Sequence, residues 1–220
     1  MGLTSLRTLY LNDNQIEDLQ HLASLSRLAW LFVSGNPVRD LTPLADCTEL
    51  KRLDITGCAV MDLNPLATLQ NLSYLTAPGC GLTSSDLEPL AALPDLAVLE
   101  LGNNQIDDLA ALASITTLSI LSLKNNAVTD LTPLQGLTEL YELSLKNNQV
   151  IDLEPLRGLK KLGSLQLEGN PVSDLSPLYE LPSLLEVFLS ADTDLGQARE
   201  LKHHLSRDAA IYIGDSWRPI

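Results

Sequence analysis

The sequence is poor in aromatic residues and in positive charge. Only 4% of its 220 residues are Phe, Trp or Tyr, so its core must be aliphatic, although 45% apolar residues allow a substantial one. Lys and Arg number 14 against 28 Asp and Glu, and the net charge is −14. The basic residues are scattered, which disfavours nucleic acid and anionic membrane surfaces as partners, because both need clustered positive charge.

Long apolar runs and targeting signals are also missing. No run approaches the about 18 to 20 residues that a membrane helix needs, so we expect no membrane insertion. The N-terminus has neither the pattern of a signal peptide nor that of a myristoylation signal. Three cysteines cannot form a disulfide framework and favour a reducing compartment.

The residue combinations of an enzyme are absent as well. A catalytic site needs a nucleophile or base with an orienting partner, and only three histidines are present. His203 and His204 are adjacent, so on a helix they diverge by about 100° and share one metal poorly. No phosphate-binding loop or zinc-ligand spacing occurs. We therefore expect no catalysis, no metal site and no cofactor.

What the sequence has instead is one phrase written nine times. Its pattern is L-x-x-L-x-L-x-x-N-x-I/V-x-D-L-x-P-L-x-x-L, with a period of 22 residues except for 24 between the fourth and fifth copies. A fixed period of this length predicts a solenoid, because one copy cannot bury its own leucines and stacked copies can. The copies begin at Leu6, Leu28, Leu50, Leu72, Leu96, Leu118, Leu140, Leu162 and Leu184.

The phrase resembles the leucine-rich repeat, in the 22-residue subclass seen in bacterial internalins and in the regulatory subunit of protein phosphatase 1. The element D-L-x-P-L carries the subclass resemblance, as in DLTPL at 40–44 and 130–134 and DLEPL at 86–90 and 152–156. The resemblance covers roughly residues 3–190. It implies an α/β solenoid, a horseshoe whose concave side is a parallel β-sheet that wraps a protein partner.

Each copy encodes a short strand and then a tight turn. The L-x-L element alternates with period two, as in a strand, and the following spacing of three suits a 3₁₀ turn. The Asp before the turn is placed to accept backbone N–H groups, and Pro in the first turn costs no hydrogen bond. We favour this capping role over calcium binding for the column of Asp18, Asp40, Asp62, Asp86, Asp108, Asp130, Asp152 and Asp174.

A second polar column is expected inside the loops. A buried Asn can both donate and accept, so it can bridge the backbone of neighbouring coils. In the third and fourth copies Cys58 and Cys80 replace Asn. A disulfide between them is conceivable, but side chains that point inward side by side fit its geometry poorly, so we favour two free buried thiols. The Asn members are Asn14, Asn36, Asn104, Asn126, Asn148 and Asn170.

The repeat breaks in the fourth copy and at both ends. The two extra residues of the fourth copy lie in GLTSSDL, which is either a tolerated surface bulge or a loop at the rim of a binding site. Asp194 is a candidate N-cap of a helix, and AAIYIG reads as a strand after it. We expect a solenoid over 1–190 and a sealing cap over 191–220. The apolar face of the cap helix is Leu195, Ala198, Leu201 and Leu205.

The strand register predicts which side chains face solvent. In LAWLFV at 28–33, Leu31 and Val33 point to the core, whereas Trp30 and Phe32 point outward and are the expected anchors. Trp, Tyr and Arg dominate interface hot spots, and contiguous apolar patches on soluble proteins usually mark contacts. The candidate partner-binding residues on the concave face are Tyr10, Trp30, Phe32, Arg52, Asp54, Tyr74, Val98 and Ile120.

The sequence thus predicts a monomeric, non-catalytic protein–protein recognition module or scaffold. Two alternatives stay open, an internalin-like secreted bacterial adhesion or virulence module and the targeting domain of a larger enzyme. A small-molecule ligand is disfavoured, because an open arc lacks an enclosed pocket. Free cysteines and the missing signal favour the cytoplasm. The N-terminus shows no cap, which favours excision from a longer chain, and secretion or the cell surface then stays open.

Overall fold

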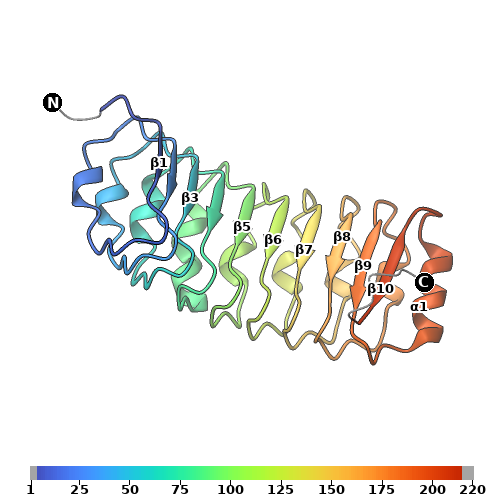
Figure 1. Ribbon diagram of the computed structural model, residues 1–220. Helices are drawn as coiled ribbons and strands as arrows, with labels where there is room; N and C mark the ends of the chain where they lie inside the picture. Colours follow the sequence, from blue (N-terminus) through green and yellow to red (C-terminus); the bar gives the residue numbers. More distant parts are fainter. Residues whose placement is uncertain (1–3, 215–220) are drawn as a thin grey trace. The chain divides into compact units, whose positions relative to one another are not determined.

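The computed structural model describes residues 4–214, and the chain falls into two compact units, Met1–Gln105 and Ile106–Ile220. In each unit, short parallel strands line one side and 3₁₀ helices lie on the other, as Figure 1 shows. In each of the nine copies, the strand begins two residues after the first Leu of the copy. The leucine-rich repeat fold, with its parallel sheet and 3₁₀ side, is therefore confirmed.

The described part of the first unit contains five strands, each paired in parallel with the next along the chain. The 22-residue period keeps the leucines in register, so that Leu9 lies beside Leu31 and Leu31 beside Leu53. The strands are β1 (Thr8–Tyr10), β2 (Trp30–Phe32), β3 (Arg52–Asp54), β4 (Tyr74–Thr76) and β5 (Val98–Glu100). The 3₁₀ helices are η1 (Gln20–Leu22), η2 (Thr42–Leu44), η3 (Asn64–Thr68) and η4 (Ser84–Ala92).

The second unit repeats this plan and adds a helix. Strands β6 to β10 again pair in parallel with their chain neighbours. The strands are β6 (Ile120–Ser122), β7 (Glu142–Ser144), β8 (Ser164–Gln166), β9 (Glu186–Leu189) and β10 (Ala210–Ile213). The helices are η5 (Ala110–Leu112), η6 (Thr132–Leu134), η7 (Glu154–Leu156), η8 (Ser176–Leu178) and α1 (Leu195–His204).

The core consists of the inward positions of each coil. Leu28, Leu31 and Val33 are fully buried, whereas Trp30 between them is 48% exposed. The alternation predicted for this stretch is therefore confirmed. It arises because successive side chains of a strand point to opposite faces.

Seven of the eight column aspartates accept a backbone N–H at the start of a 3₁₀ helix. The predicted N-cap position is wrong by one residue, because the N-cap is the Leu that follows each Asp. Each accepts the backbone N–H two residues further on, at 2.7 to 2.9 Å, in the case of Asp18, Asp40, Asp62, Asp108, Asp130, Asp152 and Asp174. Asp86 differs, because Thr83 occupies the N-cap of the longer η4 and Asp86 lies at the third helical position of a capping box. Its Oδ2 accepts the Thr83 backbone N–H at 2.7 Å, so the donor lies before the Asp in the chain and not after it as expected.

The hydrogen bonds of these aspartates indicate that the folded chain loses stability in acid. The Thr42 hydroxyl and then its backbone N–H lower the pKa of Asp40, and Thr132 does the same for Asp130. The backbone N–H and hydroxyl of Ser176 lower the pKa of Asp174. A lowered folded-state pKa contributes stability that is present above the unfolded value of about 3.9 and is lost as the pH falls through the folded one.

We expect a triple variant of Asp40, Asp130 and Asp174 to Asn to keep most of its stability at pH 7, since Asn can still accept the N–H. Between pH 5 and pH 2 it should lose less stability than the parent chain, because three titrating caps are gone. Urea midpoints at both pH values measure this difference. An identical acid loss in the two chains would contradict the capping account.

The predicted bridging by the Asn column is observed. In Asn36, Nδ2 donates to the Leu11 carbonyl of the preceding coil at 2.9 Å, and Oδ1 accepts the Ile16 N–H at 3.0 Å. Asn148 and Asn170 bond to the preceding coil in the same way. The side-chain hydrogen bonds of Asn14, in the first coil, go to its own loop.

Cys58 and Cys80 are free buried thiols, as predicted. Cys58 Sγ donates to the Val33 carbonyl at 3.4 Å and Cys80 Sγ to the Ile55 carbonyl at 3.1 Å. These carbonyls belong to the preceding coil, so the thiols take over the donor half of the Asn role. Burial raises the pKa of Cys80 to about 12, which keeps this thiol protonated and able to donate at neutral pH.

The two departures from the repeat have structural explanations. The extra residues of the fourth copy extend η4 to nine residues on the side away from the strands, so the hypothesis of a loop at a binding rim is wrong. The predicted cap helix and strand are present as α1 and β10, and Asp194 Oδ1 accepts the Gln197 N–H at 2.9 Å. Ala198 and Leu201 are buried, but Leu195 is 51% exposed and was wrongly assigned to the apolar face. The division at residue 190 stays a prediction.

Candidate functional site

The first unit brings together seven of the eight predicted binding residues on the outer side of its sheet. Trp30, Arg52, Tyr74 and Val98 are successive partners in the strand register. Tyr10, Phe32 and Asp54 form the neighbouring row. The eighth residue, Ile120, belongs to the second unit, where it pairs in register with Glu142. We call the group of seven residues in the first unit the aromatic face.

Planar side chains stack continuously across the aromatic face. The rings of Tyr10 and Phe32 are 4.6 Å apart at their centroids and 5° from parallel. The guanidinium carbon of Arg52 lies 5.5 Å from the Phe32 centroid and 3.9 Å from the Tyr74 centroid. A cation over an aromatic ring is attracted by about 0.5 to 2 kcal/mol, depending on its desolvation. The row Tyr10–Phe32–Arg52–Tyr74 is therefore held in place before any partner arrives.

Hydrogen bonds fix the polar members of the aromatic face. Asp54 Oδ1 accepts from the Thr56 backbone N–H at 3.0 Å and from its hydroxyl at 2.7 Å. The Tyr74 hydroxyl donates to Glu100 Oε1 at 3.1 Å. Sequence reasoning did not select Glu100, although it follows Asp54 and Thr76 in the same outward column. Arg52 Nε is buried and has no hydrogen-bond partner, so the two rings hold this side chain without a polar contact at that atom.

The two predicted anchors differ in how they are held. Trp30 is 48% exposed and makes no stacking or cation–π contact with the residues that the structure describes. Phe32 is half-buried, because Tyr10 stacks on it and Arg52 approaches it. Tyr10 itself is 65% exposed. Trp30 and Tyr10 therefore offer the free aromatic surface, and Phe32 supports it.

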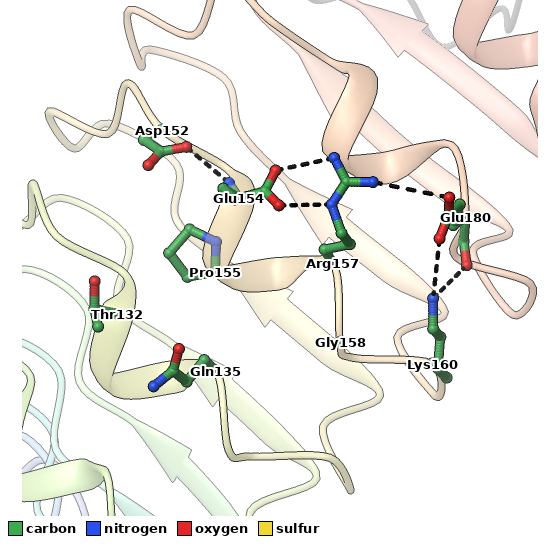
Figure 2. Close-up of a pocket in the computed structure, with 9 residues that line it drawn as sticks. All are labelled: Thr132, Gln135, Asp152, Glu154, Pro155, Arg157, Gly158, Lys160 and Glu180. Atoms are coloured by element: carbon green, nitrogen blue, oxygen red, sulfur yellow. Dashed lines mark hydrogen bonds and ion pairs between the residues drawn. The ribbon is translucent and has the colours of Figure 1, made fainter.

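On its 3₁₀ side the second unit has a charged cavity of about 770 Å³, shown in Figure 2. Arg157 contacts Glu154 through two hydrogen bonds, Nε to Oε1 at 2.7 Å and Nη2 to Oε2 at 3.0 Å. Glu180 lies 3.9 Å from Arg157 and 4.0 Å from Lys160. Exposed pairs of this kind contribute about 0 to 1 kcal/mol. Each of these charges is paired with an opposite charge, so we interpret the residues that line the cavity as a surface ion-pair network.

Among residues 4–214, no cluster of three or more His, Cys, Asp and Glu side chains could hold a metal ion. In the same range no helix is long and apolar enough to cross a bilayer. His204 stacks on Tyr179 at 4.1 Å and 7°, with Nε2 3.5 Å from Glu200, so it packs α1 against the last coil.

Comparison with protein families agrees with this architecture. The family model described as "Leucine Rich repeats (2 copies)" matches residues 4–45, 116–158 and 142–180. The chain belongs to the leucine-rich repeat family. A comparison with curated proteins gave no significant match.

Within that family the chain is similar to internalins. Internalin C2 of Listeria monocytogenes is 35% identical, with a TM-score of 0.78, 83% of this chain covered and 80% of that one. Internalin F of the same organism is 27% identical, with a TM-score of 0.77 and coverages of 97% and 70%. A TLR13–ssRNA13 complex is 26% identical, with a TM-score of 0.74, but only 29% of the TLR13 chain is covered.

Proposed function

We propose that this chain is a non-catalytic protein-recognition module that binds a protein partner on the aromatic face. The observation that carries the proposal is the stacked row beside a half-exposed Trp30. Rigid aromatic and arginine side chains on a solvent-facing surface are the typical composition of interface hot spots. The similarity to two Listeria internalins supports a binding role for this fold, and the family resemblance implies a partner on the concave side of the sheet.

The energetics favour a partner that covers Trp30 and Tyr10. Burying about 100 Å² of indole surface stabilises a complex by about 2.5 kcal/mol. Because the row Tyr10–Phe32–Arg52–Tyr74 is already ordered, binding would cost little side-chain entropy there. A monomer with this surface free is the state that we expect in the absence of the partner.

A nucleic acid is the rival partner, since TLR13 was solved with an RNA. The charges of this chain argue against it. Arg52 is the one cation among the seven residues of the aromatic face, and Asp54 belongs to the same group. Glu100 adds a second carboxylate beside Tyr74. Phosphate backbones are bound by several cations acting together, and the net charge of −14 opposes their approach.

An internalin-like adhesion module is the second candidate, favoured by the similarity to two Listeria internalins. It differs from the first candidate in the place of action rather than in chemistry. Detection of the native gene product at the bacterial surface or in the medium would support it. Retention of the whole product in the cytoplasm would exclude it.

The test compares capture of a partner by two matched variants. We expect Trp30→Ala with Phe32→Ala to weaken capture at least thirtyfold, since losing two hot spots costs more than 2 kcal/mol. The control is Met61→Ala with Ile151→Ala, which removes exposed apolar side chains outside the aromatic face. Quantitative mass spectrometry of proteins and nucleic acids retained by each chain gives the result. Equal capture by both folded variants, or capture of RNA alone, would overturn the proposal.

A further inference from the structure

The sheet of the second unit has a hollow that no sequence motif marked. It occupies about 330 Å³ over β8, whose outward residues are Ser164 and Gln166, with the buried Gly163 just before the strand. The neighbouring strands carry larger side chains at the same register, Tyr141 and Glu142 on one side and Leu185 and Glu186 on the other. The hollow therefore lies over the small side chain of Ser164, between Glu142 and Glu186, and Gln166 and Phe188 line the rest of it.

The walls of the hollow are partly apolar and open to solvent. Tyr141 is 52% exposed and Leu185 is 41% exposed. The Tyr141 ring lies directly over Gly163. A Cβ added at Gly163 would come within 2.5 Å of the ring, so only glycine leaves room for it. The backbone holds the three residues in line, with the Gly163 N–H donating to the Tyr141 carbonyl and the Leu185 N–H to the Gly163 carbonyl, both at 2.8 Å.

Glutamates from the two neighbouring strands flank the hollow on either side of Ser164. Glu142 and Glu186 are both register partners of Ser164. Ser164 Oγ lies 3.4 Å from Glu186 Oε2. Neither glutamate forms an ion pair within residues 4–214. Lys146 and Lys161, on the same coils, are each paired with another glutamate.

We propose that this hollow binds the side chain of an arginine on a partner protein. The guanidinium group of this arginine lies between Glu142 and Glu186, and the methylene groups of its side chain lie along Tyr141 and Leu185. Two strand spacings separate the glutamates by about 9.6 Å at the backbone, a gap that a planar group with donors on both edges spans. Arginine fits the hollow better than lysine, because its planar guanidinium group can also stack on an aromatic ring. The partner that the proposed function invokes would supply the arginine, but the subsite is testable without it.

The probe is N-acetyl-L-arginine amide. It is titrated into the intact ¹⁵N-labelled chain, and binding is measured from the amide chemical shifts. N-acetyl-L-citrulline amide is the matched probe, of nearly the same shape and without charge. We expect saturable shifts confined to β7, β8 and β9, with a Kd of about 1 mM for the arginine probe. The citrulline probe should bind at least tenfold more weakly.

Two double variants identify the groups responsible. Glu142→Gln with Glu186→Gln should weaken the arginine probe at least tenfold. Glu49→Gln with Glu88→Gln removes the same charge from exposed positions of the first unit and should change nothing. Dispersed amide spectra show that each variant is folded. Equal binding of both probes, or equal binding by both variants, would overturn the subsite. So would small shifts spread over the whole chain, since they indicate general attraction to its negative charge.

The outcome is separable from that of the proposed function. Trp30→Ala with Phe32→Ala should leave the response to the arginine probe unchanged, because those residues belong to the first unit. If the parent chain shows no specific response to the arginine probe while its capture of a partner still depends on Trp30 and Phe32, only the subsite is rejected. Equal capture by Trp30→Ala with Phe32→Ala and by its control variant, with a retained arginine response, would reject only the aromatic face.

Discussion

Replacing Asn148 with leucine is expected to lower the free energy of unfolding by about 3 kcal/mol. Asn148 is buried, and its Oδ1 accepts the Val128 N–H at 3.0 Å. Its Nδ2 donates to the carbonyls of Leu123 and Leu145, both at 2.9 Å. Leucine fills the space but leaves the Val128 N–H buried and unpaired, which costs about 1 to 3 kcal/mol. It also removes one hydrogen bond from each carbonyl, although Leu123 keeps the Nδ2 of Asn126 and Leu145 keeps that of Asn170.

Asn148→Cys is the matched variant, because Cys58 and Cys80 already occupy this position in two coils. A thiol can donate to the carbonyl of the preceding coil, as Cys80 does at 3.1 Å, but it accepts an N–H only weakly. We expect it to cost about half as much as leucine. Urea unfolding followed by circular dichroism measures both values. If cysteine proves as costly as leucine, the donor role assigned to the thiols is wrong.

Leu31→Ala should cost about 3 kcal/mol of stability, while Trp30→Ala, one residue away, should change it by less than about 0.5 kcal/mol. Leu31 is fully buried between the leucines of neighbouring strands, so its removal leaves a cavity. Trp30 points away from the core and is half exposed. The indole ring stacks on no described neighbour, so little packing is lost with it.

Thermal and urea unfolding of the two variants check this contrast. Each can be compared with Thr8→Ala, which alters an outward position on the adjacent strand. A large loss of stability in Trp30→Ala would mean that the indole is a structural residue, and its use as a binding anchor would then lose its basis. A small loss in Leu31→Ala would contradict the alternation on which the aromatic face depends.

These two results would separate stability from recognition. Within each unit, core leucines and the Asn column hold each coil to the next, and the half-exposed Trp30 adds little to that. A variant that loses a partner while it keeps its unfolding midpoint therefore reports on recognition itself. Leu31 and Trp30, adjacent in one strand, make this comparison within a single three-residue element.

Most of the fold follows from the sequence, because the repeat is a local pattern. The period of 22 residues sets the register of the strands, and the Asp, Asn and Pro positions set the turns. Each of these features depends on residues within one coil or at the same position of the next. The errors occurred where the period changes. Asp86 exchanged its cap role with Thr83, and Leu195 turned away from the core, because a longer helix and an end coil have different neighbours.

The sequence alone also determined which side chains of each strand face solvent, since alternation requires no knowledge of the neighbours. It could not show what those side chains do to one another. The stack of Tyr10, Phe32, Arg52 and Tyr74 joins residues that are 20 to 64 positions apart in the sequence, and rotamers decided which of these side chains meet. The hollow over Ser164 likewise depends on the larger residues that flank it on the adjacent strands. Contacts between coils belong to the tertiary structure, because stacking brings side chains together that no local pattern relates.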